Sequence, residues 1–253
     1  MTHQGFTLPT ETVKLPSKGL VYAKENPLSS GEIEMKYMTA KEEDILTNQN
    51  YISQGIVFDK LFQSMIVSKI NYDDLIAGDK NAILMAARIL GYGKDYPITY
   101  PNPENGKNEE FVVDLTRFDH KEVDFSIFNN KNEFEYTLPK SGNTVTFKLL
   151  DGSDDRTIER EIKSLKKANI SNEMTLRLKQ QILSINGNPD KKIIREFVDT
   201  GLLAADALAL RKYIKEISPD INMTFTFVGS TGYTEEGVSL PVGLSFFYPQ
   251  LWV

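Results

Sequence analysis

The chain has 253 residues, a formal net charge of -6 at pH 7, and 40% hydrophobic and 25% charged residues. It contains no cysteine, which excludes disulfides, thiolate zinc sites, iron–sulfur clusters and a cysteine nucleophile. The acidic balance repels phosphate, so we expect no nucleic acid partner, and no apolar run approaches the roughly 20 residues that span a bilayer. The only histidines are His3 and His120, and no G-x-S-x-G motif accompanies them, which disfavours a serine hydrolase.

Residues 1–31 are predicted to form an extended arm. Pro9 and Pro16 stand among alternating apolar residues, and Ser29–Gly31 ends the arm with a turn. Such an arm packs on its own domain or pairs with the sheet edge of a neighbour, and we favour the first alternative. The N-terminus lacks the basic and apolar segments of a signal peptide, so the chain is expected to fold on the cytosolic side.

Residues 32–95 are predicted to be a helical core unit that begins with one strand. The alternation in Glu32–Met38 predicts a half-buried strand, and Thr39 with Glu42 fits a capping box at the start of the next helix. The apolar residues of Gly55–Ser68 recur at helical spacing and predict another helix with a broad apolar face.

The segment Gly78–Gly93 is apolar on nearly every side, which is typical of a helix in the centre of a core. We expect Asp79 to cap its N-terminus and Gly91 to close it in the left-handed conformation. Arg88 is then a buried cation, and we expect it to form a structural ion pair. Structural roles are therefore predicted for five residues: Thr39, Glu42, Asp79, Arg88 and Gly91.

The remaining residues divide into three predicted parts. Residues 96–150 read as a small antiparallel β module, and residues 151–220 as a helical domain of about four helices that starts with Ser153 or Asp154 as its cap. Residues 221–253 are predicted to be a C-terminal β segment that packs with 96–150. The expected fold class is therefore α+β.

The C-terminus is crowded with aromatic residues, including the only tryptophan. We read Leu244–Pro249 as a strand. Aromatic crowding at a terminus indicates docking on the chain's own β module or on another subunit. The partner interface is accordingly predicted at the last residues: Phe246, Phe247, Tyr248, Pro249 and Trp252.

Several segments together resemble the baseplate hub proteins of T-even-like contractile-tailed bacteriophages. They follow the same order and spacing from about residue 15 to residue 249: Leu15–Tyr22, Glu34–Leu46, Asp74–Leu84, Val113–Leu115 and Phe246–Pro249. The resemblance implies a baseplate component or a hub assembly factor, located in the virion and in the host cytoplasm during assembly. It implies other baseplate and hub proteins as partners, with self-association possible, and no catalytic activity.

Relatives of this type carry C-P-x-C-like knuckles near two positions of this chain. These positions are Tyr100–Pro103 and Gly229–Gly232, and neither contains cysteine here. The resemblance therefore implies that a zinc role is lost and only the tight turns remain, and that the modules at 96–150 and 223–249 lie together in space.

Three functions remain open at this stage. The first is a structural or assembly protein of the baseplate that acts through protein–protein interfaces, and the second is a hub assembly chaperone that is absent from the mature virion. The third belongs to another class, a metal-dependent hydrolase that would use the carboxylates of Glu42, Asp73, Asp74 and Asp79. We favour the first, with no catalytic residue, no metal ligand and no cofactor.

Overall fold

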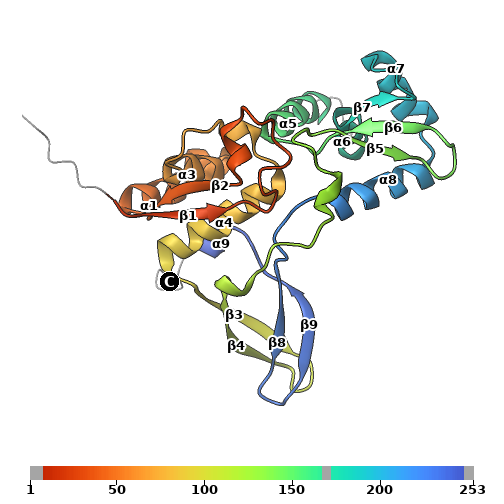
Figure 1. Cartoon of the computed structure of the whole chain (residues 1–253). Coiled ribbons are helices and arrows are strands. Elements are labelled where there is room, and N and C mark those ends of the chain that lie inside the picture. Colours follow the sequence, from red (N-terminus) through yellow and green to blue (C-terminus); the bar gives the residue numbers. More distant parts are fainter. Residues whose placement is uncertain (1–7, 167–171, 248–253) are drawn as a thin grey trace, which may run out of the picture.

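The computed structural model describes residues 8–166 and 172–247, and these residues form three lobes (Figure 1). We name the lobes by their residues: the N-terminal lobe (8–94 and 244–247), the β lobe (95–114 and 224–239) and the distal lobe (132–217). Helices and small antiparallel sheets are mixed throughout, which confirms the α+β prediction. No helix formed by the described residues is long and apolar enough to cross a membrane.

The N-terminal lobe combines a two-stranded sheet with a group of helices. Its elements are β1 (Thr10–Lys14), η1 (Pro27–Ser30), β2 (Glu32–Lys36), α1 (Ala40–Thr47), α2 (Gln49–Gln54), α3 (Val57–Met65), η2 (Tyr72–Asp74) and α4 (Ala77–Tyr92). Strand β1 pairs antiparallel with β2, so that Val13 lies opposite Ile33. The described part of the N-terminal arm therefore packs on its own domain, as favoured from the sequence.

Helix α4 lies at the centre of the N-terminal lobe, with most of its side chains buried. The apolar segment therefore forms a core helix, as predicted, but its ends differ from the prediction. Its N-cap is Ile76 and its C-cap is Gly93, which has a positive φ of 82°. Gly91 lies inside the helix, where a Cβ would come within 2.9 Å of the Met38 side chain. Its role is close packing rather than helix closure.

The β lobe consists of two hairpins that lie side by side and extend away from the helical lobes (Figure 1). They are β3 (Asp95–Asn102) with β4 (Lys107–Asp114), and β8 (Thr224–Val228) with β9 (Thr234–Ser239). Their inner faces meet through aromatic rings: Phe111 stacks on Phe225 at 5.8 Å, and Tyr100 contacts Phe227 at 4.7 Å between centroids. The C-terminal hairpin thus returns to the first hairpin after α4.

The distal lobe packs five helical elements around a three-stranded sheet of order β5-β6-β7. Its elements are β5 (Phe134–Thr137), β6 (Thr144–Phe147), α5 (Gly152–Lys166), α6 (Glu173–Gln181), β7 (Ile182–Ile185), α7 (Lys191–Glu196), the π-helical η5 (Phe197–Gly201) and α8 (Ala204–Ile217). Two short 3-10 turns lead into this lobe, η3 (Leu115–Arg117) and η4 (Phe125–Ile127).

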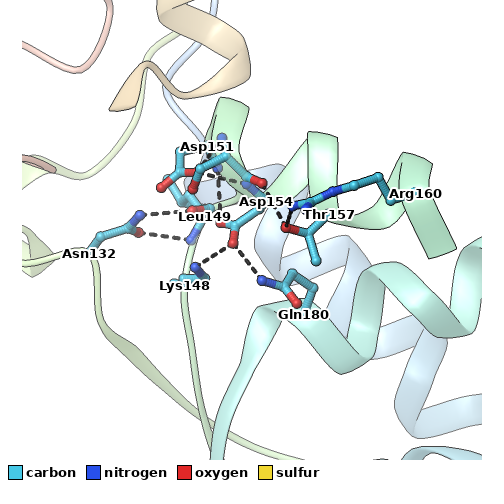
Figure 2. Close-up of polar contacts among 9 residues, drawn as sticks. Asn132, Lys148, Leu149, Asp151, Asp154, Thr157, Arg160 and Gln180 are labelled. Carbon is cyan, nitrogen blue, oxygen red and sulfur yellow. Dashed lines mark hydrogen bonds and ion pairs between the residues drawn. The ribbon is translucent and has the colours of Figure 1, made fainter. Parts of the chain in front are cut away.

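A buried carboxylate joins the sheet of the distal lobe to its helices (Figure 2). Asp154 is 3% exposed and accepts hydrogen bonds from Lys148 Nζ and Gln180 Nε2, both at 2.7 Å. The start of α5 is capped by Asp151, whose Oδ1 accepts the backbone N–H groups of Ser153 and Asp154. The prediction of Ser153 or Asp154 as the cap was therefore wrong by two or three residues.

Three segments adopt a structure other than the predicted one. The residues Ile182–Ile185 lie within the predicted helical domain 151–220 but form the strand β7, because β6 offers them an unpaired edge. The residues Leu244–Phe247, predicted to be a strand, form the short helix α9. The hairpins within 96–150 belong to two different sheets, since β3–β4 stands alone and β5–β6 pairs with β7.

Candidate interaction surfaces and their internal supports

The carboxylate of Asp79 is completely buried in the first turn of α4. It accepts three hydrogen bonds from the N-terminal arm: from the Ser17 backbone N–H (3.0 Å), the Ser17 hydroxyl (2.7 Å) and the Tyr22 hydroxyl (2.5 Å). Burial raises the pKa of Asp79 and, together with the neighbouring carboxylate, also raises the pKa of Tyr22. The predicted capping role is thus replaced by a tie between the arm and the central helix.

Glu42 is also completely buried, at the start of α1. The predicted capping box is present: the Glu42 carboxylate accepts the Thr39 backbone N–H at 3.0 Å. It also accepts hydrogen bonds from Lys36 Nζ (2.8 Å) and the Ser64 hydroxyl (2.6 Å), which belong to β2 and α3. Burial alone would raise the pKa of Glu42, but these hydrogen bonds outweigh it and lower the pKa to about 2.

The Glu42 contacts predict a specific loss of stability in acid. Because the folded pKa lies below the ordinary value, the stabilisation is complete above about pH 4.5 and disappears as the pH falls through 2. We expect Glu42→Gln to cost about 3 kcal/mol of unfolding free energy at pH 7 and progressively less towards pH 2. Urea unfolding at a series of pH values measures this. Asp44→Asn, at an exposed position of α1, is the control, and a pH-independent effect of Glu42→Gln would contradict the prediction.

Arg88 does not form the predicted ion pair with any described residue. Its guanidinium donates to the backbone carbonyl of Gly93 at 3.0 Å and lies 5.4 to 6.0 Å from the ring centroids of Tyr92, Tyr96 and Phe246. Burial lowers the pKa of this side chain, which is only 3% exposed. Aromatic faces attract a cation without a second charge, so Arg88 joins α4 to β3 and α9 through cation–π contacts.

The predicted partner interface at Phe246 and Phe247 is corrected, because both side chains are 0% exposed. Phe246 packs edge-on against Tyr96 at 4.9 Å, and Phe247 contacts Phe58 at 5.4 Å between centroids. These rings complete the core of the N-terminal lobe and are unavailable to a partner. The other predicted interface residues lie outside the described residues: Tyr248, Pro249 and Trp252.

The lobes meet near the N-terminal end of α4, where the chain segments that contain Lys121 and Asp220 cross it. The Lys121 backbone N–H donates to the Asp220 carbonyl at 2.7 Å, and the Asp220 carboxylate accepts the Asn81 side chain at 2.8 Å. Lys121 Nζ donates to the Glu216 and Ser218 carbonyls at the end of α8. A cation at a helix C-terminus satisfies orphan carbonyls and opposes the negative end of the dipole. This junction fixes α8 and both crossing segments relative to α4.

Gly78 permits this crossing, since a Cβ at Gly78 would lie 1.8 Å from the Pro219 carbonyl oxygen. We expect Gly78→Ala to lower the unfolding free energy by about 3 kcal/mol, because backbone atoms on both sides must move apart. The matched control is Gly91→Ala in the same helix, where only the flexible end of Met38 must shift. Urea unfolding of both variants measures the difference, and equal stability would contradict a close approach at Pro219.

The turns at the tips of the two β-lobe hairpins lie together, which agrees with the contact between the modules at 96–150 and 223–249 that the family resemblance implied. Asn102, which is 0% exposed, donates from one Nδ2 to Thr231 Oγ1 (3.0 Å) and to Glu109 Oε1 (2.9 Å). Glu109 also accepts the backbone N–H and the hydroxyl of Ser230, both at 2.7 Å. These Ser230 hydrogen bonds, with one from Asn105, lower the pKa of Glu109 to about 2. A hydrogen-bond network therefore connects the turns where knuckles would use thiolates.

The four carboxylates of the hydrolase hypothesis lie in separate contacts. Asp79 and Glu42 accept the buried hydrogen bonds described above, Asp73 forms an ion pair with Arg156, and Asp74 accepts the Asn26 side chain at 2.8 Å. Within residues 8–166 and 172–247, no three His, Asp or Glu side chains lie together in a way that could hold a metal ion.

No local sequence pattern predicts the partners of Asp79, Gly78 and Lys121. Ser17 and Tyr22 lie about 60 residues from Asp79, at separations of 62 and 57, so no local pattern connects them. Gly78 stands directly before the predicted cap Asp79, and a glycine at such a position can also indicate close backbone approach. Lys121 carried no signal, because a single lysine in a loop is ordinary.

The chain matches one protein-family model over residues 9–247, nearly its whole length, and that family is described as the T4 bacteriophage base plate protein. The chain therefore belongs to this family. It is a T4-like phage baseplate protein with a structural or assembly role in the tail baseplate, among other baseplate proteins. No curated protein and no solved structure matches it.

Proposed function

We propose that the chain is a non-enzymatic structural or assembly protein of the hub region of the baseplate, acting through protein–protein interfaces. The observation that carries the proposal is how its buried polar side chains are used. Asp79, Glu42 and Asp154 each tie different elements of the chain together. Such carboxylates hold a scaffold in one shape, so the surfaces of the lobes carry the interactions.

The hub assignment rests on the segments that resemble hub proteins, and family membership supports the wider baseplate role. Two versions of the function are compatible with these segments. In one, the chain stays in the finished tail. In the other, it is a chaperone that helps the hub to assemble and then leaves.

Mass spectrometry of purified virions and of isolated baseplate intermediates tests the proposal. We expect the chain in both fractions at a constant ratio to the hub proteins. Its presence in the intermediates alone would replace the structural version by the chaperone version. Its absence from both fractions would overturn the proposed function.

The hydrolase hypothesis can be tested in the same preparations with two substituted chains. Asp73→Asn and Asp74→Asn remove the two carboxylates that are not buried. If the chain acts only through interfaces, these variants enter baseplates at the wild-type ratio and the phage remains infectious. Loss of infectivity from particles of normal composition would instead indicate chemistry at these residues.

A further inference from the structure

The two strands of the first β-lobe hairpin have very different free edges. The Leu115 N–H donates to the Lys94 carbonyl, so the pairs Pro97–Val112 and Pro101–Asn108 occupy positions whose backbone groups point away from the partner strand. Prolines thus remove two N–H donors from the outer edge of β3. The outer edge of β4 contains no proline and keeps its donors at Asn108, Glu110, Val112 and Asp114. Proline on an edge strand blocks pairing, so only β4 is open to a further strand.

A groove runs along this open edge between β4 and β8. It has a volume of about 510 Å³ and is lined by Phe111, Val112 and Asp114 on one side and by Thr224, Phe225 and Thr226 on the other. Val112, one of the residues that line the groove, is 58% exposed. The hairpins touch through their inner aromatic rings, but β4 and β8 belong to separate two-stranded sheets. An added strand would therefore have backbone partners on β4 and apolar contacts at the groove floor.

The charge of the chain is concentrated on the β lobe. Residues 95–114 and 224–239 contain seven carboxylates and one lysine, a net charge of -6 that equals the formal charge of the whole chain. The carboxylates are Asp95, Glu104, Glu109, Glu110, Asp114, Glu235 and Glu236. Lys94 and Arg117 lie at the base of the lobe, where Lys94 pairs with Asp114 at 2.9 Å and Arg117 lines one end of the groove. The field along most of the β4 edge therefore attracts a cationic ligand.

We propose that β4 accepts an extended basic segment of a neighbouring baseplate protein as an added antiparallel or parallel strand. The inference rests on the proposed function for the existence of such a neighbour, and on the edge, the groove and the charge for its chemistry. In the added strand, apolar side chains face inward over Phe111 and Phe225. Lysine or arginine side chains alternate with them and face the outer side of β4, beside Glu110.

A second copy of this chain fits the β4 edge less well, because the edge is acidic in both copies. Pairing β4 with another β4 would bring two acidic edges together, and like charges opposite each other in a sheet are destabilising. Complementary charge, rather than symmetry, selects the partner of this edge.

The experiment uses the full chain and a synthetic probe, the capped peptide Thr-Lys-Val-Lys-Val-Lys-Thr, with the same peptide carrying glutamate in place of lysine as control. Amide hydrogen exchange is followed residue by residue. We expect the cationic peptide to slow exchange at Glu110 and Val112 by about ten-fold or more. The acidic peptide should leave these amides unchanged.

The decisive variant is Val112→Pro, which removes an outward N–H without breaking a bond of the hairpin, because the backbone groups of Val112 point away from β3. Val112→Thr keeps the N–H and is the matched control. Peptide protection should vanish in Val112→Pro and persist in Val112→Thr. Protection that survives Val112→Pro, protection only at another strand, or a concentration-dependent dimer that Val112→Pro abolishes would each overturn the proposal.

A comparison of the wild-type chain with Val112→Pro separates this inference from the proposed function. If wild-type chain enters baseplate intermediates and Val112→Pro fails to, both stand. If both enter equally, the β4 edge is not the interface although the baseplate role holds. If wild-type chain itself never enters, the proposed function fails, and the peptide measurement still decides whether the edge binds basic strands.

Discussion

Phe247→Ala is expected to lower the unfolding free energy of the chain by about 4 kcal/mol, as is typical for removing a fully buried ring. Phe247 is 0% exposed and contacts Phe58 and Phe62 of α3 at 5.4 and 6.5 Å between centroids. The ring lies between secondary-structure elements that are far apart in sequence, so the cavity left by alanine cannot close locally. Urea unfolding followed by circular dichroism measures the loss.

Phe246→Ala should cost a similar amount and has a second effect. It removes one of the aromatic faces around the Arg88 guanidinium, which is buried and makes no ion pair with a described residue. Val242→Ala, at a 40% exposed position just before α9, is the control and should change stability by less than about 1 kcal/mol. If both phenylalanine variants had wild-type stability but lost partner binding, Phe246 and Phe247 would instead form a partner interface.

Asp79→Ala is expected to destabilise the chain by about 4 kcal/mol, because it leaves three buried donors of Ser17 and Tyr22 without an acceptor. Asp79→Asn should cost less. Burial already raises the pKa of this carboxyl, so a neutral group loses little solvation, and its amide oxygen still accepts a hydrogen bond. The measurement is again urea unfolding at pH 7.

Tyr22→Phe removes one donor of this network and should cost about 1 kcal/mol. Asp119→Ala, at an exposed carboxylate, is the control for the loss of a negative charge. The arm also provides a local measurement: hydrogen exchange at the Leu15 and Leu20 amides should accelerate in Asp79→Ala more than exchange in the distal lobe. Uniform acceleration across the chain would contradict the assignment of Asp79 as a tie between arm and α4.

Local patterns predicted the elements that depend on neighbours in sequence. The capping box at Thr39 and Glu42 and the core helix containing Arg88 both have signals within a few residues. Composition and spacing also indicated the fold class. The family resemblance, carried by several segments in order, agrees with the family match at the level of a baseplate protein.

The failures come from interactions between distant segments. Ile182–Ile185 continues a helical stripe in sequence, but the free edge of β6 draws it into a strand. Phe246 and Phe247 looked like interface residues because a terminal aromatic cluster can dock on its own domain or on a partner. Their burial depends on α3 and on Tyr96, which no local pattern brings to the C-terminus. The ends of α4 were misplaced for a similar reason, since Asp79 bonds to the arm rather than to its own helix.

The hydrogen bonds between the tips of the β lobe determine how contact between the two turns responds to pH and to the redox state of the surroundings. Glu109 and Asn102 connect the two turns without thiolates, in a chain with no cysteine. The hydrogen bonds between the tips then depend on proton activity, through the Glu109 carboxyl whose pKa is about 2, and they use no thiolate. These contacts between the two tips would therefore hold equally in reducing and in oxidising surroundings.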